Sequence, residues 1–431
     1  PGGRAPAARR PARVEGVAVR IAVVGSGISG LLAAYLLHPE HEVTLFEAEE
    51  RVGGHTCTVD VAAGGRTFAV DTGFIVFNEK TYPNFVRLLK TLGVAARPSA
   101  MSFSVKCPQT GIEFRPSGPS TYFAQRRNLL RPAFYRMLLE IRRLRRDLAA
   151  LAAHGDPALT LGAYLDRRGY SAFFRRHFLE PMGAAIWSSP PGALRRFPAP
   201  FFARFFQNHG FLELVQPRWL TVAGGSRSYL EPLTRPFRDR IRTGCPVRAV
   251  RREPGGIRLH AGGAEFAFEA IVLAVHSDQA LALLADPSEA ERAILGAIPY
   301  RENRIALHTD TTILPARRRA WAAWNYLVPG DEEAEVAVTY DMNILQGLAA
   351  PVEFLVSLNL EARLDPRRIL HRALFSHPVY TAEGISARGR LEEIQGVRRT
   401  YFAGAWCGFG FHEDGVNSAL SVCRRFGREL A

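Results

Sequence analysis

A glycine-rich turn near the start of the chain has the residue spacing that binds a nucleotide diphosphate. The turn Gly25-Ser26-Gly27-Ile28-Ser29-Gly30 follows a β-branched run, VRIAVV, and opens an apolar helical pattern. The first glycine permits the turn, the second lets a pyrophosphate approach the backbone, and the third lets helix and strand pack closely, while the helix N-terminus attracts phosphate charge. Glu47 ends the next predicted strand, about 20 residues on, where a carboxylate accepts hydrogen bonds from ribose hydroxyls and disfavours a 2′-phosphate. The pattern predicts a dinucleotide site; a glycine turn that only packs a helix is the alternative.

Four later segments extend this pattern and carry a family resemblance. They are FEAEERVGGHTCTV at 46–59, VDTGFIVFN at 70–78, VAGGSRSYL at 222–230 and YFAGAWCGFGFHEDGVNSALSV at 401–422. In these motifs and their order the chain resembles the flavin-containing amine oxidase superfamily. The resemblance implies FAD as the cofactor and an FAD-dependent oxidoreductase as the activity.

The resemblance also implies where the cofactor is held. Residues 46–59 match the motif that covers the pyrophosphate and ribose, residues 70–78 match the loop under the flavin ring, and Val247 matches a strand backbone beside adenine. The C-terminal motif implies a helix N-terminus that stabilises negative charge at flavin N1 and O2. The expected cofactor-binding residues are Gly25, Ser26, Gly27, Ser29, Gly30, Glu47, Ala48, Arg51, Gly53, Gly54, His55, Thr56, Thr72, Gly73, Phe74, Val247, Gly404, Ala405, Gly415 and Val416.

Two of these positions depart from the superfamily pattern. His55 stands where an arginine is commoner, and Ala405 stands where an acidic residue usually contacts the ribityl chain. Glu413 and Asp414 are nearby acids that could substitute, and solvated loop residues are the alternative for both.

A narrower resemblance bears on the substrate. The runs GGHT, DTGFIVFN, TYPNF, IWSS and GFHEDG together resemble a bacterial subgroup of FAD-binding proteins that accompany cyclopropane-fatty-acyl-phospholipid synthase-like methyltransferases. This resemblance implies a lipid acyl chain as substrate and such a methyltransferase as a partner. The implied chemistry is dehydrogenation or isomerisation of the acyl chain by hydride transfer to flavin N5.

The distribution of lysine in the sequence weakens the hypothesis that the protein is an amine oxidase. Amine oxidases of the superfamily commonly place a lysine near flavin N5, in a strand of the later half of the chain. Here the only lysines are Lys80, Lys90 and Lys106. A flavin amine oxidase, an isoprenoid or tetrapyrrole desaturase or oxidase, and a non-catalytic lipid-binding flavoprotein remain alternatives to the acyl-chain enzyme.

His412 and Glu413 are the candidate catalytic residues. His412 adjoins the C-terminal flavin motif, and histidine titrates near neutral pH. The alternatives are a loop histidine that holds backbone groups and, for Glu413 and Asp414, a role in capping the following helix. Asn78, Trp187 and Tyr340 are weaker candidates for a substrate pocket.

Two segments have compositions that suit a lipid. Residues 126–148, RRNLLRPAFYRMLLEIRRLRRDL, form a basic amphipathic stretch of the kind that binds anionic head groups; a core-facing helix with solvated arginines is the alternative. Residues 197–211, FPAPFFARFFQNHGF, are dense in phenylalanine, which favours ordinary core, with an acyl tunnel or a membrane-inserted segment as the alternatives.

The elements that position these residues indicate an α/β fold. Strands are expected at 19–24 and 42–47 around a helix closed by Pro39, three more strands within 244–275, and a strand at 401–405 followed by a helix, all in one sheet. Residues 95–215 have helical spacing and 300–360 alternate as strands. We expect a discontinuous Rossmann-type FAD-binding domain (17–94, 216–297 and 385–431), a mixed α+β substrate domain of the amine oxidase-like kind (95–215 and 298–384), and a disordered tail (1–16).

Composition narrows the partners. The 431 residues carry a formal charge of +14, which favours an anionic partner, and no RRM, KH, zinc-finger or helix-turn-helix signature points to nucleic acid. The five cysteines are scattered and form no CxxC pair, so we expect neither a disulfide framework nor a metal site. With no apolar run near the roughly 20 residues of a membrane span, we expect a soluble cytoplasmic protein, peripheral at the inner membrane face through residues 126–148.

Overall fold

The computed structural model describes residues 18–156, 158–209, 217–331 and 334–431, so the predicted tail lies outside the described residues. The chain divides into two compact units. Of the described residues, the first unit takes those up to Gly54, Glu231–Gly296 and Gly389–Ala431, and the second unit takes those within His55–Leu230 and Ala297–Arg388. The predicted boundaries at 297 and 385 lie within a few residues of these limits, whereas residues 55–94 and 217–230, grouped by motif with the cofactor domain, pack in the second unit.

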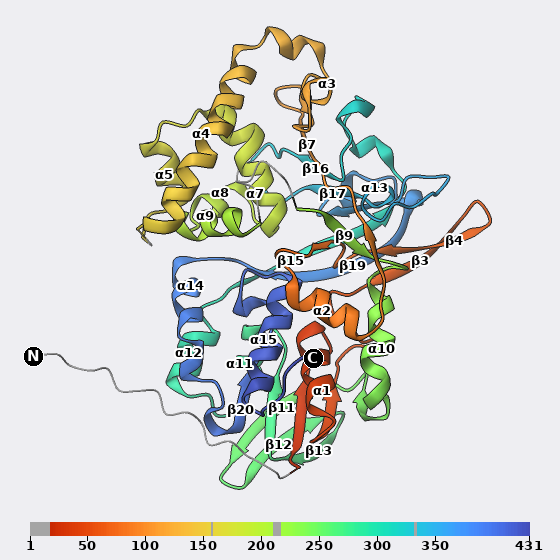
Figure 1. Cartoon of the computed structure of the whole chain (residues 1–431), viewed down its shortest axis with the longest axis vertical. Coiled ribbons are helices and arrows are strands. Elements are labelled where there is room, and N and C mark those ends of the chain that lie inside the picture. Colours follow the sequence, from red (N-terminus) through yellow and green to blue (C-terminus); the bar gives the residue numbers. More distant parts are fainter. Residues whose placement is uncertain (1–17, 157, 210–216, 332–333) are drawn as a thin grey trace, which may run out of the picture. The chain divides into compact units, whose positions relative to one another are not determined.

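A five-stranded parallel sheet forms the core of the first unit (Figure 1). Its neighbours run in parallel throughout, and β1 and β14 are almost wholly buried, as expected for strands covered on both faces. The predicted strand–helix–strand unit is confirmed, with α1 (Ile28–Leu37) ending two residues before Pro39. The strand order is β10 (Ile241–Arg242), β2 (Glu42–Phe46), β1 (Arg20–Val24), β14 (Ala270–Leu273) and β20 (Thr400–Phe402).

The prediction for residues 244–275 was wrong in number and in sheet. Four strands form there, and β11 (Val247–Glu253), β12 (Gly256–Ala261) and β13 (Ala264–Phe268) make a separate antiparallel sheet, so only β14 joins the parallel one. Strands β11 and β12 alternate buried and exposed residues, which suits a sheet with one solvated face. The turn at Gly262 and Gly263, both with positive φ, closes a tight hairpin between β12 and β13.

The remaining helices of the first unit are α11 (Ser277–Leu283), α12 (Glu289–Leu295) and α15 (His412–Arg424). The last of these packs against α1, so the final helix of the chain lies beside the first. Helix α10 (Leu230–Thr234) and helix α14 (Ala382–Gly389) lie where the chain passes from one unit to the other.

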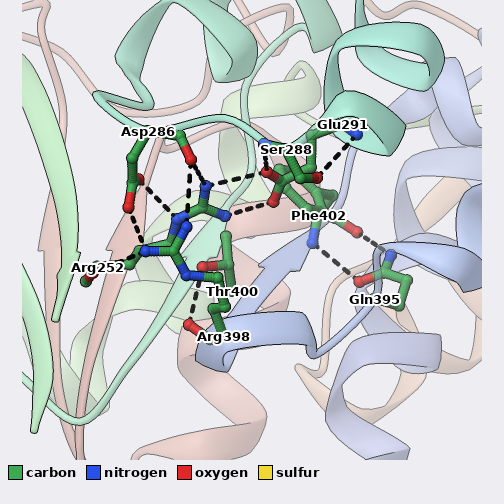
Figure 2. A network of polar contacts seen from close by, with 8 residues as sticks. All are labelled: Arg252, Asp286, Ser288, Glu291, Gln395, Arg398, Thr400 and Phe402. Atoms are coloured by element: carbon green, nitrogen blue, oxygen red, sulfur yellow. Dashed lines mark hydrogen bonds and ion pairs between the residues drawn. The ribbon is translucent and has the colours of Figure 1, made fainter. Parts of the chain in front are cut away.

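An ion network with a buried centre ties β11 to α12 and to the turn before β20 (Figure 2). Arg252 Nε donates to Asp286 Oδ1 at 3.0 Å and Arg252 Nη2 donates to Glu291 Oε2 at 2.9 Å. The side chains of Arg252 and Glu291 are both 1% exposed. Arg398, which has a positive φ of 50°, donates to the Arg252 carbonyl at 2.8 Å and pairs with Asp286. The network therefore fixes the approach of the chain to the edge strand β20.

Three sheets build the described part of the second unit. The largest is antiparallel except for the pair β16–β7, and it confirms the strands predicted within 300–360. Its order is β19 (Ile369–Pro378), β15 (Tyr300–His308), β18 (Leu355–Leu358), β17 (Val338–Asp341), β16 (Trp324–Leu327), β7 (Phe103–Cys107) and β8 (Ile112–Phe114). The smaller sheets pair β3 (Thr58–Ala63) with β4 (Arg66–Asp71), and β9 (Trp219–Val222) with β5 (Phe77–Asn78) and β6 (Ala96–Pro98).

The helices of the second unit gather mainly between residues 119 and 208. They are α3 (Pro119–Tyr122), α4 (Pro132–His154), α5 (Leu161–Arg167), α6 (Ala172–Phe174), α7 (Glu180–Trp187), α8 (Pro191–Arg195) and α9 (Ala199–Asn208), with α2 (Pro83–Thr91) and α13 (Met342–Leu345) elsewhere. Among the helices that the structure describes, none combines the length and the hydropathy that a bilayer-crossing segment needs.

The phenylalanine-rich segment is core, as favoured from sequence. The rings of Phe197, Phe201, Phe202, Phe205 and Phe206 are at most 5% exposed and surround Trp187, whose ring centroid lies 4.5 Å from that of Phe205. Trp187 is therefore a packing residue of this cluster. The end of the predicted run, residues 210–211, lies outside the described residues.

Candidate cofactor site

The glycine turn lies at the carboxyl end of β1, directly before α1. Gly25 has a φ of +97°, and a Cβ there would stand 2.6 Å from the Ala274 carbonyl oxygen. A Cβ at Gly30 would stand 1.9 Å from the Gly25 carbonyl oxygen. A Cβ at Gly27, by contrast, would meet nothing within 4 Å. The protein itself requires the outer two glycines, and the middle one leaves open space at a helix N-terminus, which is where a diphosphate binds.

Glu47 is held beside this turn by its own hydrogen bonds. Its Oε2 accepts from the Ser26 backbone N–H at 2.8 Å and from the Ser26 hydroxyl, and its Oε1 accepts from the Glu49 N–H at 2.9 Å. The Cys245 N–H donates to the Glu47 carbonyl at 2.8 Å. Cys245 lies two residues before Val247, so this hydrogen bond brings the start of β11 near Glu47. The carboxylate is thus placed next to the turn, as a ribose-binding acid must be.

The second glycine motif packs on the first. The Gly53 N–H donates to the Ser26 carbonyl at 3.0 Å, and a Cβ at Gly54 would stand 3.2 Å from Gly27 Cα. Arg51 Nη1 donates to the Gly54 carbonyl at 3.0 Å, while Ala48 is exposed. These contacts bring the predicted pyrophosphate-covering residues against the turn.

The C-terminal motif joins the same cradle. Ser29 Oγ donates to the Gly415 carbonyl at 2.9 Å, and a Cβ at Gly415 would stand 2.8 Å from Ile28 Cγ2. The Gly404 N–H donates to Ser418 Oγ at 2.9 Å, and Ala405 follows in a short 3-10 helix. Helices α1 and α15 therefore begin side by side, and the prediction that the two chain ends fold together is confirmed.

These features fit the diphosphate and ribose of FAD. Two adjacent helix N-termini favour negative charge, the space over Gly27 admits a close approach, and Glu47 supplies the acceptor for ribose hydroxyls. Val416 is fully buried behind the start of α15 and contributes packing there. The assignment of individual cofactor contacts stays a prediction.

His412 and Glu413 are the first two residues of α15, so they lie on a helix where a loop was the alternative. Burial lowers the pKa of His412 to about 3, which leaves its ring neutral at neutral pH. A general base works best with a pKa near the operating pH, so this value disfavours His412 as the base. Glu413 is 6% exposed. Asp414 caps the helix, because its Oδ2 accepts from the Phe411 N–H at 2.9 Å.

In the second unit, the predicted flavin loop is pinned to the segment that follows Gly54. The Thr72 N–H donates to the Cys57 carbonyl and the Phe74 N–H donates to the His55 carbonyl, both at 2.8 Å. A Cβ at Gly73 would stand 2.0 Å from the His55 oxygen, so glycine is required there. Thr56 bonds through its hydroxyl to the buried Tyr229 hydroxyl. The predicted residues of this unit thus form one tight loop pair.

Asp71 is a buried acid behind this loop that our sequence reasoning did not single out. Its carboxylate accepts from the Ser226 N–H and the Ser226 hydroxyl at 2.8 Å, from Thr58 Oγ1 at 2.6 Å and from Gln346 Nε2 at 3.0 Å. Burial raises the pKa of Asp71 to about 6. The sequence feature that could have indicated this role is an acidic residue directly before Thr72 and Gly73, whose backbone must be held in place.

A second group missed from sequence surrounds His55. Its ring stacks on Phe375 with centroids 4.6 Å apart and lies 5.3 Å from the ring of His377, both on β19. Asn303 Nδ2 donates to His377 Nδ1 at 3.2 Å, which leaves the proton of a neutral His377 on Nε2. Two imidazoles and a phenyl ring therefore flank the start of the loop. Tyr340, by contrast, packs edge-on against Trp324, and Asn78 holds the turn at Thr81 through its side-chain amide.

Comparisons with known proteins agree with this arrangement. The model of the family described as flavin containing amine oxidoreductase matches residues 28–342. A flavin-dependent L-tryptophan oxidase from Lentzea aerocolonigenes is 26% identical over an alignment of 278 positions. The alignment covers 56% of this chain and 54% of that enzyme, so this chain spans about half of this relative.

Solved structures extend the likeness over nearly the whole chain. A cyclohexylamine oxidase from Brevibacterium oxydans has a TM-score of 0.68 at 17% identity and covers 96% of this chain and 100% of its own. A CLA-producing fatty acid isomerase from P. acnes has a TM-score of 0.69, also at 17% identity, over 95% of this chain and 98% of its own. At these identities the likeness establishes the fold.

Proposed function

The chain belongs to the flavin-containing amine oxidoreductase family and is an FAD-dependent oxidoreductase, and from this premise we propose that its substrate is a fatty-acyl chain, which it dehydrogenates or isomerises. FAD supplies the hydride acceptor in such chemistry, while the protein supplies position, electrostatics and exclusion of water.

The observation that carries the proposal is the distribution of lysine. The sequence has none after Lys106, so none of the strands from β8 to β20 presents an ammonium group. The strand lysine typical of amine oxidases in this superfamily has no counterpart here. A chain that oxidises a C–H bond of an alkyl group needs no such residue.

A structural neighbour supports the same substrate class. The fatty acid isomerase acts, by its name, on an acyl chain, and its fold matches this chain as well as that of cyclohexylamine oxidase does. The fold therefore accommodates acyl substrates as readily as amines.

The roles of individual residues follow from their positions. The turn at Gly25–Gly30, Glu47 and the start of α15 hold the cofactor, and the network around Asp71 fixes the loop of Thr72 to Phe74. Glu413 is our candidate for accepting the proton that leaves the substrate, because burial leaves His412 with too low a pKa.

Amino-acid or amine oxidation is the second candidate. The tryptophan oxidase is 26% identical to this chain over about half of each protein, and the cyclohexylamine oxidase shares the fold. This candidate predicts turnover of tryptophan or of cyclohexylamine with release of peroxide in air.

The test separates four outcomes with one purified holoprotein. Under anaerobic conditions the protein is mixed with dioleoyl phospholipid, free oleate, L-tryptophan or cyclohexylamine, while flavin absorbance is followed and acyl products are analysed by mass spectrometry. Dehydrogenation bleaches the flavin and adds one double bond, whereas isomerisation moves a double bond without net bleaching. Bleaching by tryptophan or amine alone would sink the acyl proposal. Bleaching by neither class, with unchanged acyl chains, would leave a flavoprotein without the proposed activity.

Glu413→Gln tests the proposed role of Glu413, since it keeps the size of this buried side chain while it removes the carboxylate. With the right substrate we expect turnover to fall roughly 10²–10⁴-fold, the usual contribution of a general base. Retained FAD absorbance in this variant shows that the cradle is intact.

A further inference from the structure

The exposed apolar side chains of this protein concentrate in one short segment. Among the described residues, nine large apolar side chains are exposed, and five of them lie between residues 129 and 139. Leu130 is 87% exposed and Leu139 is 66% exposed. Clustered apolar exposure of this kind marks an interaction surface, whereas single exposed residues do not.

Helix α4 (Pro132–His154) has two chemically different faces. One face packs into the second unit through Phe134, Met137, Leu144 and Leu148, which are at most 3% exposed. The opposite face begins with Tyr135, Leu138 and Leu139 and continues, at the spacing of helical turns, with arginines. We call the exposed residues Leu129, Leu130, Tyr135, Leu138 and Leu139 the apolar tip.

Arginines surround the apolar tip. Arg126 precedes it, and Arg142, Arg145 and Arg146 follow it on the exposed side of α4. These four have no carboxylate partner among the described residues, whereas Arg136 pairs with Glu140 at 3.4 Å and Arg143 with Asp147 at 3.6 Å. A hollow of about 770 Å³ lies along this part of α4, lined by the five arginines between 136 and 146 and by Leu139, Glu140 and Gly169. The surface therefore offers unneutralised positive charge next to exposed leucines.

We propose that this face docks on an anionic lipid bilayer, with the apolar tip in the interface and the arginines at the phosphate plane. Burial of apolar side chains at the boundary of the acyl chains lowers the free energy of binding, and the arginines beside them interact favourably with the negative head groups. An anionic bilayer therefore accommodates both the apolar tip and the arginines of this face. This docking does not depend on the substrate proposed above.

A second copy of the chain fits this face less well. Self-association through it would bring Arg142, Arg145 and Arg146 of one chain against the same arginines of another, and like charges in contact oppose binding. Charge complementarity thus selects the membrane over a homodimer.

The test is vesicle flotation of the full chain with bound FAD. Vesicles of phosphatidylcholine alone are compared with vesicles of equal parts phosphatidylcholine and phosphatidylglycerol. We expect binding to the anionic vesicles only, weakened by added salt. Binding to neither vesicle, or equally to both, refutes the proposal.

Two charge-matched double variants locate the surface. Each basic residue near an anionic bilayer strengthens binding about fivefold. Arg145→Glu with Arg146→Glu removes two such attractions and adds two repulsive charges, so it is expected to weaken binding at least about 100-fold. Arg248→Glu with Arg251→Glu changes the net charge equally on exposed positions of β11 and is expected to change binding little. Equal losses in the two variants would mean that overall charge, and not this face, drives binding, which overturns the proposal.

Two leucine-matched variants test insertion of the tip. Leu130→Ser with Leu139→Ser is expected to weaken vesicle binding about tenfold. Leu370→Ser with Leu374→Ser alters leucines of similar class on β19, 43% and 55% exposed, and is expected to leave binding unchanged. Equal binding by both variants refutes insertion. Concentration-dependent dimerisation that only the Leu130 and Leu139 variant abolishes would assign the face to a second copy instead.

Discussion

Substituting alanine at Gly27 and at Gly30 separates what the glycine turn does for the fold from what it does for the cofactor. Both residues belong to one motif and lie three positions apart. Gly27 has extended backbone angles, φ −65° and ψ 176°, that any residue adopts, and a Cβ there meets no protein atom within 4 Å. A Cβ at Gly30 stands 1.9 Å from a backbone oxygen, so the backbone must move.

The magnitudes follow from these distances. Gly30→Ala should lower the free energy of unfolding of the FAD-free protein by about 3 kcal/mol or more, at the upper end of overpacking costs. Gly27→Ala should change it by at most about 1 kcal/mol, the scale of an N-cap replacement. The Gly27 methyl group instead occupies the space over the helix N-terminus. Losing one or two charge-assisted hydrogen bonds to the diphosphate should weaken FAD binding about 100- to 1,000-fold.

The assay measures both quantities on the same preparations. Urea unfolding of each variant stripped of FAD, followed by circular dichroism, gives stability from the midpoint and slope. Titration with FAD, followed by the change in flavin fluorescence, gives affinity.

The reasoning fails if Gly27→Ala binds FAD as tightly as the parent chain, because the diphosphate then lies elsewhere. It also fails if Gly27→Ala destabilises the FAD-free protein as much as Gly30→Ala does. A larger Gly27→Val side chain should weaken FAD binding further while the FAD-free protein remains folded.

Three further outcomes test the framework. Arg252→Met leaves Glu291 buried without its guanidinium and should cost about 3–5 kcal/mol in unfolding free energy, whereas exposed Arg258→Met should cost little; replacing Arg252 and Glu291 together by methionine should recover most of the loss. Burial raises the pKa of Asp71 from 3.8 to about 6, so the folded state favours its protonated form. The free energy of unfolding should therefore fall by roughly 3 kcal/mol as pH rises from 4 to 6 and then level off. Asp71→Asn should remove this pH dependence, which urea unfolding at a series of pH values measures. His412→Gln should lower turnover by less than the roughly 10²-fold expected for loss of a general base, and an acidic limb that vanishes in this variant would restore His412 as the base.

The local parts of the site could be predicted from sequence because their signals are local. The turn at Gly25–Gly30 and the acid at Glu47 belong to a strand–helix–strand unit whose spacing is fixed by geometry. Resemblance added the segments at 46–59 and 401–422, and the contacts between Ser29 and Gly415 show why these must meet.

The parts that sequence did not reveal depend on distant partners. Asp71 is satisfied by Ser226 and Gln346, which lie 155 and 275 positions away, and no periodic pattern encodes such a set. Strands β11 and β12 alternate like any half-exposed strand, so their pattern indicates a strand but not the sheet to which it belongs.

The basic stretch at 126–148 shows a third limit. The pattern there predicts one apolar face, but the structure divides its leucines between two: Leu144 and Leu148 are buried, while Leu130 and Leu139 are exposed. Periodicity marks apolar residues without telling which of them the rest of the fold will cover. Both interpretations considered from sequence, a core-facing helix and an exposed basic amphipathic surface, apply to different faces of α4.

The position of β20 at the edge of the parallel sheet has a consequence during protein synthesis. Ser29 and Gly415, whose hydrogen bond helps close the cradle, are 386 positions apart, so the ribosome must make the whole stretch between them before they can meet. Until β20 emerges, β14 presents an unpaired apolar edge, AIVL, of the kind that attracts other strands. The nascent protein is therefore prone to aggregate until β20 has paired with β14, and the complete cradle for FAD is expected only once α15 has emerged.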